Sequence, residues 1–258
     1  MMKTWWITVV TALSAPTLSA AAPPSVTLAD GVADGRRFGA FVNTWRFYRE
    51  HEDGSIEELG LWHDRVEIIH RAGVEILHRV QRTEPRDDRP ALVVLNEMRR
   101  DTMAPIRSRF AHGSDSAAFL DVRFDGRTLT GTMPIAPADG APMPVSFSLT
   151  TPEPVFDWTQ WGLLLAALPL EEGYTARFTG FNNDPNQAPL LTVTVHVEGS
   201  ERVPVPQRGD VECFVVNVHA GIPWTFWIAQ DRRAGPPIIK IRIDDSPGQR
   251  RWWTPTDD

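Results

Sequence analysis

The sequence has very little cysteine, since Cys213 is the only one among its 258 residues. No disulfide can form within the chain, and the fold therefore has to rest on its apolar core. For an exported protein, this fits a bacterial periplasm better than a disulfide-stapled extracellular module. Because Cys213 alternates with apolar residues, we expect it to be a small buried side chain and not a reactive thiol.

Motifs for catalysis and metal binding are also missing. The seven histidines form neither a His-x-His pair nor a His-Glu-x-x-His helix, and no Gly-x-Ser-x-Gly nucleophile turn occurs. Adjacent acids such as Glu171 and Glu172 diverge on a turn or strand, whereas glycoside hydrolysis needs two carboxyls that face one bond. We therefore predict no enzymatic activity, no metal site and no cofactor.

Positive charge is in deficit, with 26 Lys and Arg against 33 Asp and Glu and a formal net charge of −7. This balance argues against nucleic acid as a partner and against docking on anionic lipid headgroups. Apolar runs are short as well: none reaches the roughly 20 residues that cross a bilayer as a helix. We therefore expect no transmembrane anchor.

The N-terminal segment has the three parts of a secretory signal peptide. Lys3 supplies the positive end, Trp5–Leu13 the short apolar run, and Ser19–Ala22 the small residues that signal peptidase accepts. We predict a signal peptide over residues 1–21 and a periplasmic location. The remainder, 22–258, is within the size range of a single all-β domain.

From Phe38 onward, apolar and polar residues alternate with a period of two. Leu120–Asp125 and Thr192–Val197 are the clearest examples. One apolar and one polar face are typical of antiparallel strands with one side in water. Roughly a dozen such segments are more than one flat sheet usually carries. We predict an all-β, mainly antiparallel fold, built as a strongly curved sheet or an incomplete barrel.

The last predicted strand covers residues 238–243. Its alternation places Ile239, Ile241 and Ile243 toward the core, and Lys240 and Arg242 toward water. Residues 245–258 follow as a short C-terminal tail of the single domain.

One segment, near residues 157–168, indicates a helix. It is rich in Leu and Ala, Asp157 is a good N-cap residue, and Pro169 cannot continue the helical hydrogen bonds. Apolar residues occupy nearly every direction around this short helix, which is typical of a buried helix. We expect it to close the concave side of the sheet.

Tryptophan is unusually frequent, with ten residues in the chain. Eight follow the signal peptide: Trp45, Trp62, Trp158, Trp161, Trp224, Trp227, Trp252 and Trp253. They could fill a core, stack on sugars, or line an apolar cavity for acyl chains or similar ligands. For the cavity hypothesis, the candidate ligand-binding residues are Trp158, Trp161, Leu164, Leu165 and Trp227. The alternatives are an envelope-assembly protein with a filled core and a carbohydrate-binding module.

The order of several short motifs resembles a known family. The motifs are Asp101–Arg107, Phe124–Gly131, the Asp157 helix with its end at Leu168–Leu170, Val197–Val203 and Trp227–Arg233. They resemble the exported bacterial proteins of domain-of-unknown-function family 3108, over roughly residues 38 to 244. The resemblance implies a periplasmic β-fold, loosely similar to the half-barrel carriers that shuttle lipoproteins. It implies no catalytic residue.

Overall fold

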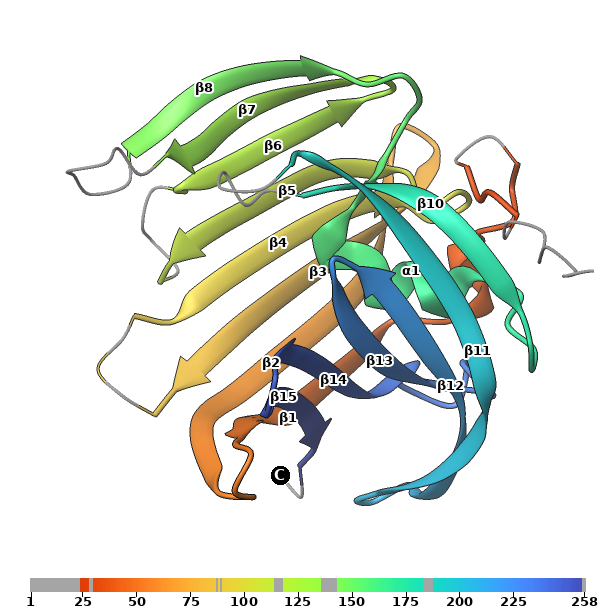
Figure 1. Cartoon of the computed structure of the whole chain (residues 1–258). Coiled ribbons are helices and arrows are strands. Elements are labelled where there is room, and N and C mark those ends of the chain that lie inside the picture. Colours follow the sequence, from red (N-terminus) through yellow and green to blue (C-terminus); the bar gives the residue numbers. More distant parts are fainter. Residues whose placement is uncertain are drawn as a thin grey trace, which may run out of the picture.

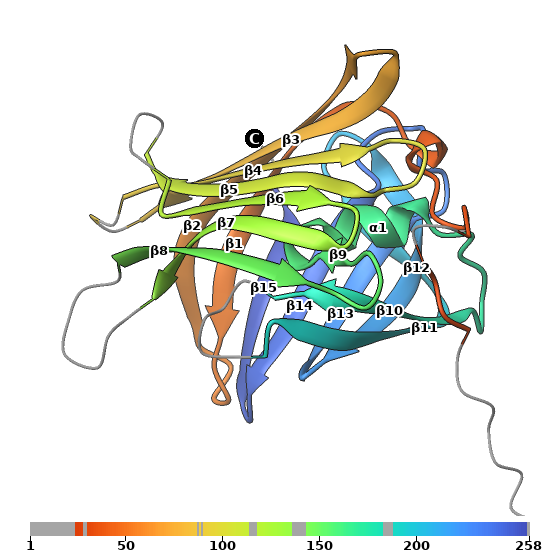
Figure 2. The same ribbon diagram turned by 90° about the horizontal axis from the view of Figure 1, so that it is seen from above.

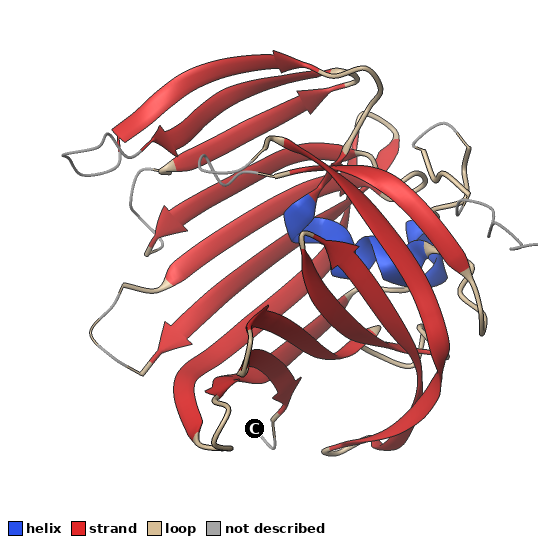
Figure 3. Ribbon diagram, in the orientation of Figure 1, coloured by secondary structure: helices blue, strands red, loops and turns tan. Residues whose placement is uncertain are grey.

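The computed structural model describes residues 24–27, 30–86, 88, 90–113, 118–135, 143–182 and 188–256. The predicted signal peptide, residues 1–21, lies outside these residues. Within them, fifteen strands form a single sheet (Figures 1 and 3). The strands are β1 (Phe41–Glu50), β2 (Ile56–Arg71), β3 (Val74–Pro85), β4 (Leu92–Arg99), β5 (Pro105–His112), β6 (Leu120–Asp125), β7 (Thr128–Ile135), β8 (Met143–Thr150), β9 (Phe156–Asp157), β10 (Thr175–Phe181), β11 (Leu190–Val205), β12 (Gly209–Ala220), β13 (Ile222–Ala229), β14 (Ile238–Ser246) and β15 (Gln249–Pro255). The helical elements are the 3-10 turns η1 (Gly35–Arg37) and η2 (Trp158–Gln160) and the helix α1 (Trp161–Ala167).

The strands lie in the order β8-β7-β6-β5-β4-β3-β2-β1-β15-β14-β13-β12-β11-β10-β9. Each pair of neighbours is antiparallel except β9 and β10, which are parallel. The two halves of the chain join where β1 pairs with β15, and β8 and β9 are the edges of the described sheet. Figure 2 shows the sheet curving around α1. The prediction of an all-β, mainly antiparallel, curved sheet is confirmed.

The predicted helix near residues 157–168 is confirmed, but it begins differently from the prediction. Its first turn is the 3-10 turn η2, and all seven residues of α1 are buried. Asp157 occupies the N-cap position without a capping hydrogen bond from its side chain, so that part of the prediction was wrong. Its carboxylate instead accepts hydrogen bonds from the side chains of Asn96 and Thr159. Within the described residues, no helix is both long and apolar enough to cross a membrane.

Polar contacts hold α1 at both ends. At the C-terminal end, Nη1 of the buried Arg232 donates to the carbonyls of Ala166 at 2.9 Å and Leu168 at 2.6 Å. The carbonyl groups at the C-terminal end of a helix have no N–H donor within the helix, and Arg232 supplies one here. At the N-terminal end, Nε2 of Gln160 donates to the carbonyl of Met103 at 3.1 Å. The helix is therefore a fixed part of the concave side and not a loosely attached cover.

The C-terminal segment corrects the predicted domain layout. Residues 245–258 were expected to be a tail, but Asp245 and Ser246 end β14, and Gln249–Pro255 form β15, which pairs with both β14 and β1. Trp253 stacks on Phe47 of β1 on the inner face, with ring centroids 4.5 Å apart. Arg251 in this segment is ion-paired to Asp245, and Nη1 of Arg250 lies 3.9 Å from Oε1 of Glu50. The segment is thus a central strand.

A bulge in the pairing of β13 with β14, next to Trp227 and Ile228, corrects a second detail. Ile241 and Ile243 belong to the inner core as predicted. Ile239 is also buried, but it packs on the opposite face of the sheet. An inserted residue shifts the alternation of a strand by one, and the inward prediction for Ile239 was wrong for this reason.

Candidate functional site

A cavity of about 640 Å³ lies between the concave face of the sheet and the η2–α1 segment. Its lining is mostly aromatic and aliphatic. Six of the tryptophans contribute to it: Trp45, Trp62, Trp158, Trp161, Trp224 and Trp253. Phe47, Leu92, Val94, Phe110, Ile222, Phe226, Ile238, Ile241 and Ile243 add further apolar surface. Ligand sites of proteins measure roughly 300–1,000 Å³ and are lined in this way.

The rings around the cavity support one another. Trp224 lies edge-on to Trp161 and Trp158, with centroids 6.2 and 6.5 Å apart, and is stacked on Phe226 at 5.9 Å. Trp161 also lies against Gly180 of β10, where a Cβ atom would come within 2.8 Å of Cζ2 of the ring. Any larger residue at that position would displace the ring. The aromatic wall is therefore held in place by packing from behind.

Two of the five predicted site residues line this cavity. Trp158 and Trp161, from η2 and the start of α1, contribute to the wall as predicted. Leu164 and Leu165 are on the same helix but are completely buried in the core cluster and do not line the cavity. They anchor the helix to the surrounding core, because a helix buried on all sides turns only part of its circumference toward the hollow side.

The fifth predicted site residue, Trp227, does not belong to the cavity. Trp224 and Phe226 of the same strand point inward, so Trp227 points to the outer face. There its Nε1 donates to Glu201 at 2.8 Å, and Nζ of Lys240 lies 4.3 Å above its ring. The prediction failed because it counted tryptophans without assigning a face to each.

The outer face bears on the sugar-stacking alternative. Trp252 and Trp227 lie 6.1 Å apart on this face, and Lys240 covers both rings, with Nζ 4.8 Å from the Trp252 centroid. Partial burial of Lys240 lowers the pKa of its ammonium group. Lys240 is therefore not a freely solvated residue, which corrects the expectation that it faces water. Ring faces occupied by a lysine offer little stacking surface to a sugar.

Sequence reasoning missed four tryptophans of the cavity: Trp45, Trp62, Trp224 and Trp253. A usable signal was present for Trp45, since it shares a strand face with Phe47 two residues later. Trp62 and Trp253 join them because β2 and β15 flank β1 in the sheet. That adjacency depends on the strand order, which local patterns do not contain.

The polar side of the cavity is centred on Arg79. Its guanidinium forms a buried ion pair with Asp64, with Nη2 2.6 Å from Oδ2 and Nε 2.9 Å from Oδ1. Nη1 donates to the carbonyl of Thr159 at 3.1 Å. The amide oxygen of Gln81 accepts from Trp62 Nε1 at 2.9 Å and from Arg79 Nη2 at 3.1 Å. This cluster is largely satisfied internally and joins β2 and β3 to η2.

A second polar cluster lies deeper, where β9 enters η2. Asp157 is fully buried, and Nδ2 of Asn96 donates to its Oδ2 at 3.2 Å, to Oγ1 of Thr159 at 2.6 Å and to Oγ of Ser108 at 3.1 Å. Burial raises the pKa of the Asp157 carboxyl from 3.8 to about 6, despite the hydrogen bond from Thr159, which lowers it. Asp157 does not line the cavity. Its geometry suits a residue that positions η2.

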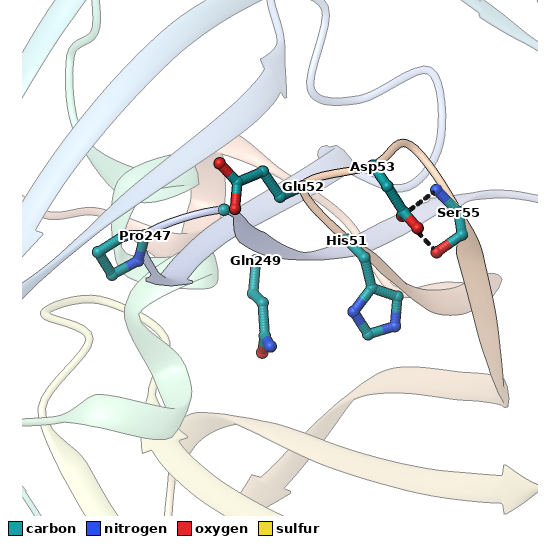
Figure 4. A pocket seen from close by; sticks show the side chains of 7 residues that line it. His51, Glu52, Asp53, Ser55, Pro247 and Gln249 are labelled. Atoms are coloured by element: carbon teal, nitrogen blue, oxygen red, sulfur yellow. Dashed lines mark hydrogen bonds between the residues drawn. The ribbon is translucent and has the colours of Figure 1, made fainter.

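A second, smaller depression of about 460 Å³ lies between the β1–β2 and β14–β15 turns (Figure 4). It is lined by His51, Glu52, Asp53, Ser55, Pro247, Gly248 and Gln249. Asp53 accepts hydrogen bonds from the backbone N–H and hydroxyl of Ser55 at 2.9 and 2.6 Å, so its carboxylate serves the turn. Among the described residues, no three metal-ligating side chains gather as a metal site would require.

The chain matches one protein-family model and is similar to a solved structure. The family model described as "Protein of unknown function (DUF3108)" matches residues 97–251. No curated protein matches the chain. Among solved structures, the chain is similar to a crystal structure of a beta-barrel-like protein of domain of unknown function DUF1849 from Brucella abortus. The two share 13% identity and a TM-score of 0.47, and the match covers 84% of this chain and 96% of that one.

Proposed function

The chain belongs to the family of proteins of unknown function DUF3108, whose model matches more than half of it, so its role has to be inferred from its own site. We propose that it is an exported, periplasmic, non-enzymatic protein that holds an apolar or lipid-like ligand between its curved sheet and α1. The observation that carries the proposal is the cavity of about 640 Å³ lined by six tryptophans. Lys3, Trp5–Leu13 and Ser19–Ala22 support the export part of it.

The size of the cavity favours a ligand over a filled core. Native interiors pack about as densely as organic crystals, and voids larger than a water molecule are few. This apolar hollow is partly open to solvent, so its aromatic and aliphatic lining faces water where a filled core would face protein atoms. A bound apolar ligand would supply the packing contacts that the lining lacks when the hollow is empty of protein atoms. The rigid wall formed by Trp161, Trp224 and Phe226 is compatible with a ligand that enters a preformed site.

The side chains of Arg79 and Gln81 in the lining support an apolar guest as well. Arg79 and Gln81 already bond to each other and to Asp64, Trp62 and Thr159. Groups that are satisfied within the protein demand no partner from the ligand. The rings and aliphatic side chains then dominate recognition, and binding should follow the apolar area removed from water.

The test is a titration with N-phenyl-1-naphthylamine, a neutral fluorescent probe of apolar sites, followed by displacement with fatty alcohols. Wild-type protein should bind the probe. Affinity for decanol, dodecanol and tetradecanol should rise about fourfold with each methylene until the cavity is full, since each buried methylene contributes about 0.8 kcal/mol.

A matched pair of variants on β12 makes this test specific. Ala220 lines the cavity, whereas Val215 packs on the outer face. Ala220→Phe should abolish or strongly weaken probe binding, and Val215→Phe should leave it unchanged. Failure of the wild type to bind any of these molecules, in protein with a normal melting temperature, would refute the proposal in favour of a closed interior.

Export is checked separately. Protein recovered from the periplasm of its own host should begin between Ala21 and Pro23, as read by N-terminal sequencing. Periplasmic protein with an intact Met1 would contradict the signal peptide. Native mass spectrometry of the same material reports any lipid that co-purifies.

A further inference from the structure

The charged residues of the cavity have one sign. Among the described residues that line it, the ionisable ones are Arg79 and Arg251, and no carboxylate or histidine contributes to the lining. Arg79 is committed to Asp64 and to the carbonyl of Thr159. Arg251 is different because its side chain is 34% exposed. Arg251 is thus the cation that a bound molecule could reach.

Arg251 keeps donors for a ligand. Its Nε and Nη2 donate to the two carboxylate oxygens of Asp245, and no hydrogen bond from its Nη1 occurs among the described residues. A guanidinium has five N–H groups, so one edge of Arg251 can face an anion while the other holds Asp245. Trp253 follows Arg251 by two residues, so it lies on the same face of β15, and it belongs to the aromatic wall of the cavity.

A second arginine stands beside it. Arg49 of β1 is directly opposite Arg251 of β15 in the register, on the inner face that Phe47 and Trp253 share. Directly opposed like charges destabilise a sheet. Arg49 is held by Glu57, with Nη1 2.6 Å from Oε2, and its buried Nε has no hydrogen-bond partner among the described residues. The next pair on the outer face, Glu50 opposite Arg250, has opposite charges.

From this juxtaposition we infer that the cavity selects single-chain amphiphiles with an anionic head. The head lies at Arg251, with Arg49 as its neighbour on β1, and the alkyl chain lies along the tryptophans toward Trp161. Each arginine already has one carboxylate partner, Glu57 for Arg49 and Asp245 for Arg251, and an anionic head would accept from the N–H groups of Arg251 that Asp245 does not use. This inference rests on the proposed function and narrows its ligand class. A carboxylate or a phosphate would satisfy the same chemistry.

The experiment compares laurate, lauryl phosphate and lauryl alcohol as competitors of N-phenyl-1-naphthylamine in low salt. Both anions should bind wild-type protein about tenfold more tightly than the alcohol, as expected for one charge-assisted hydrogen-bonded contact at a partly exposed site. The preference should shrink at high salt, because screening weakens exposed charge pairs. If laurate binds more tightly than lauryl phosphate, fatty acids are the natural ligand class. If lauryl phosphate binds more tightly, the natural ligands have lysophospholipid-type heads.

Three variants locate the head. Arg251→Gln should lower the affinity for both anions about tenfold, to the level of the alcohol, and Arg251→Lys should restore part of the preference. Arg250→Gln, one residue away on the outer face, should change neither. Melting temperatures identify any variant that is simply misfolded.

Two outcomes separate this inference from the function on which it rests. If wild-type protein binds the alcohol as tightly as both anions, and Arg251→Gln alters nothing, the anionic ligand class is overturned while the apolar binding site stands. If neither the alcohol nor the anions bind, the proposed function itself fails.

Discussion

Replacing Asp157 by Asn should stabilise the protein at neutral pH. The carboxyl is fully buried, and burial raises its pKa to about 6 from 3.8. Above pH 6 the folded protein therefore has to ionise Asp157 in an apolar setting, which the unfolded chain does not. Oδ1 of Asp157 and Oδ1 of Asn96 have no hydrogen-bond partner among the described residues. An amide at this position can keep the bonds to Asn96 and Thr159 through its oxygen and carries N–H donors of its own.

The magnitude follows from the linkage of proton binding to folding. A folded-state pKa that lies about 2 above the unfolded value corresponds to about 3 kcal/mol. Because the folded pKa of Asp157 is the higher one, its protonated form contributes stability that is fully present below pH 3.8 and is lost as the pH rises through about 6. Asp157→Asn should therefore raise the free energy of unfolding by about 3 kcal/mol at pH 7.5 and by only about 0.5 kcal/mol at pH 4.

Urea unfolding of wild type and variant at both pH values measures this difference. Subtracting the two proteins at each pH cancels the other titrating groups, which they share. Asp121→Asn is the control with the opposite sign, because the hydrogen-bonded Arg107 lowers the pKa of the Asp121 carboxyl. It should lose stability at pH 7.5. If Asp157→Asn were destabilised equally at both pH values, Asp157 would have to be ionised and well solvated by its hydrogen bonds, and the reasoning would be wrong.

Three further changes test the packing around α1 and β14. Trp161→Ala should cost about 3–5 kcal/mol of unfolding free energy in urea, since the ring is 3% exposed and packs against Trp224; a loss below 1 kcal/mol would mean that the aromatic wall is not part of the core. Arg232→Met should cost about 2 kcal/mol, because the carbonyls of Ala166 and Leu168 lose their donor, and hydrogen exchange should rise in α1 first; unchanged exchange there would remove the anchoring role. Ile241→Asp should prevent stable folding, because it places an unpaired charge on the inner face. Circular dichroism measures the loss of structure. The control Lys240→Gln, on the outer face, should fold, and an equally unfolded control would contradict the assigned faces.

Some features of the fold could be predicted from the sequence because they depend on residues close together in the chain. Alternation in segments such as Thr192–Val197 indicates a strand with one apolar face wherever that strand ends up. The Leu- and Ala-rich segment before Pro169 forms a helix because propensity and termination are local properties. The burial of Cys213 was also correct, and burial raises the pKa of its thiol to about 12.

The errors occurred where the answer depends on a neighbour distant in sequence. β15 was taken for a tail, and only its pairing with β1, at the other end of the chain, makes it a central strand. Ile239 changed faces because of a bulge, which depends on how β13 and β14 pair. Asp157 was interpreted as a helix cap, but its carboxylate bonds to Thr159 and to Asn96, and Asn96 is 61 residues away on β4.

The cavity shows the same division. Composition alone established that the chain is rich in tryptophan and carries a helix apolar enough to be buried. Which tryptophans face the hollow side was decided by strand register, which turns Trp224 inward and its neighbour Trp227 outward. The pairing of β1 with β15 brings Phe47 to Trp253 and Arg49 to Arg251 across about 200 residues of chain. Local propensity acts over a few residues, whereas a sheet assembles its faces from strands that meet only when the whole chain has folded.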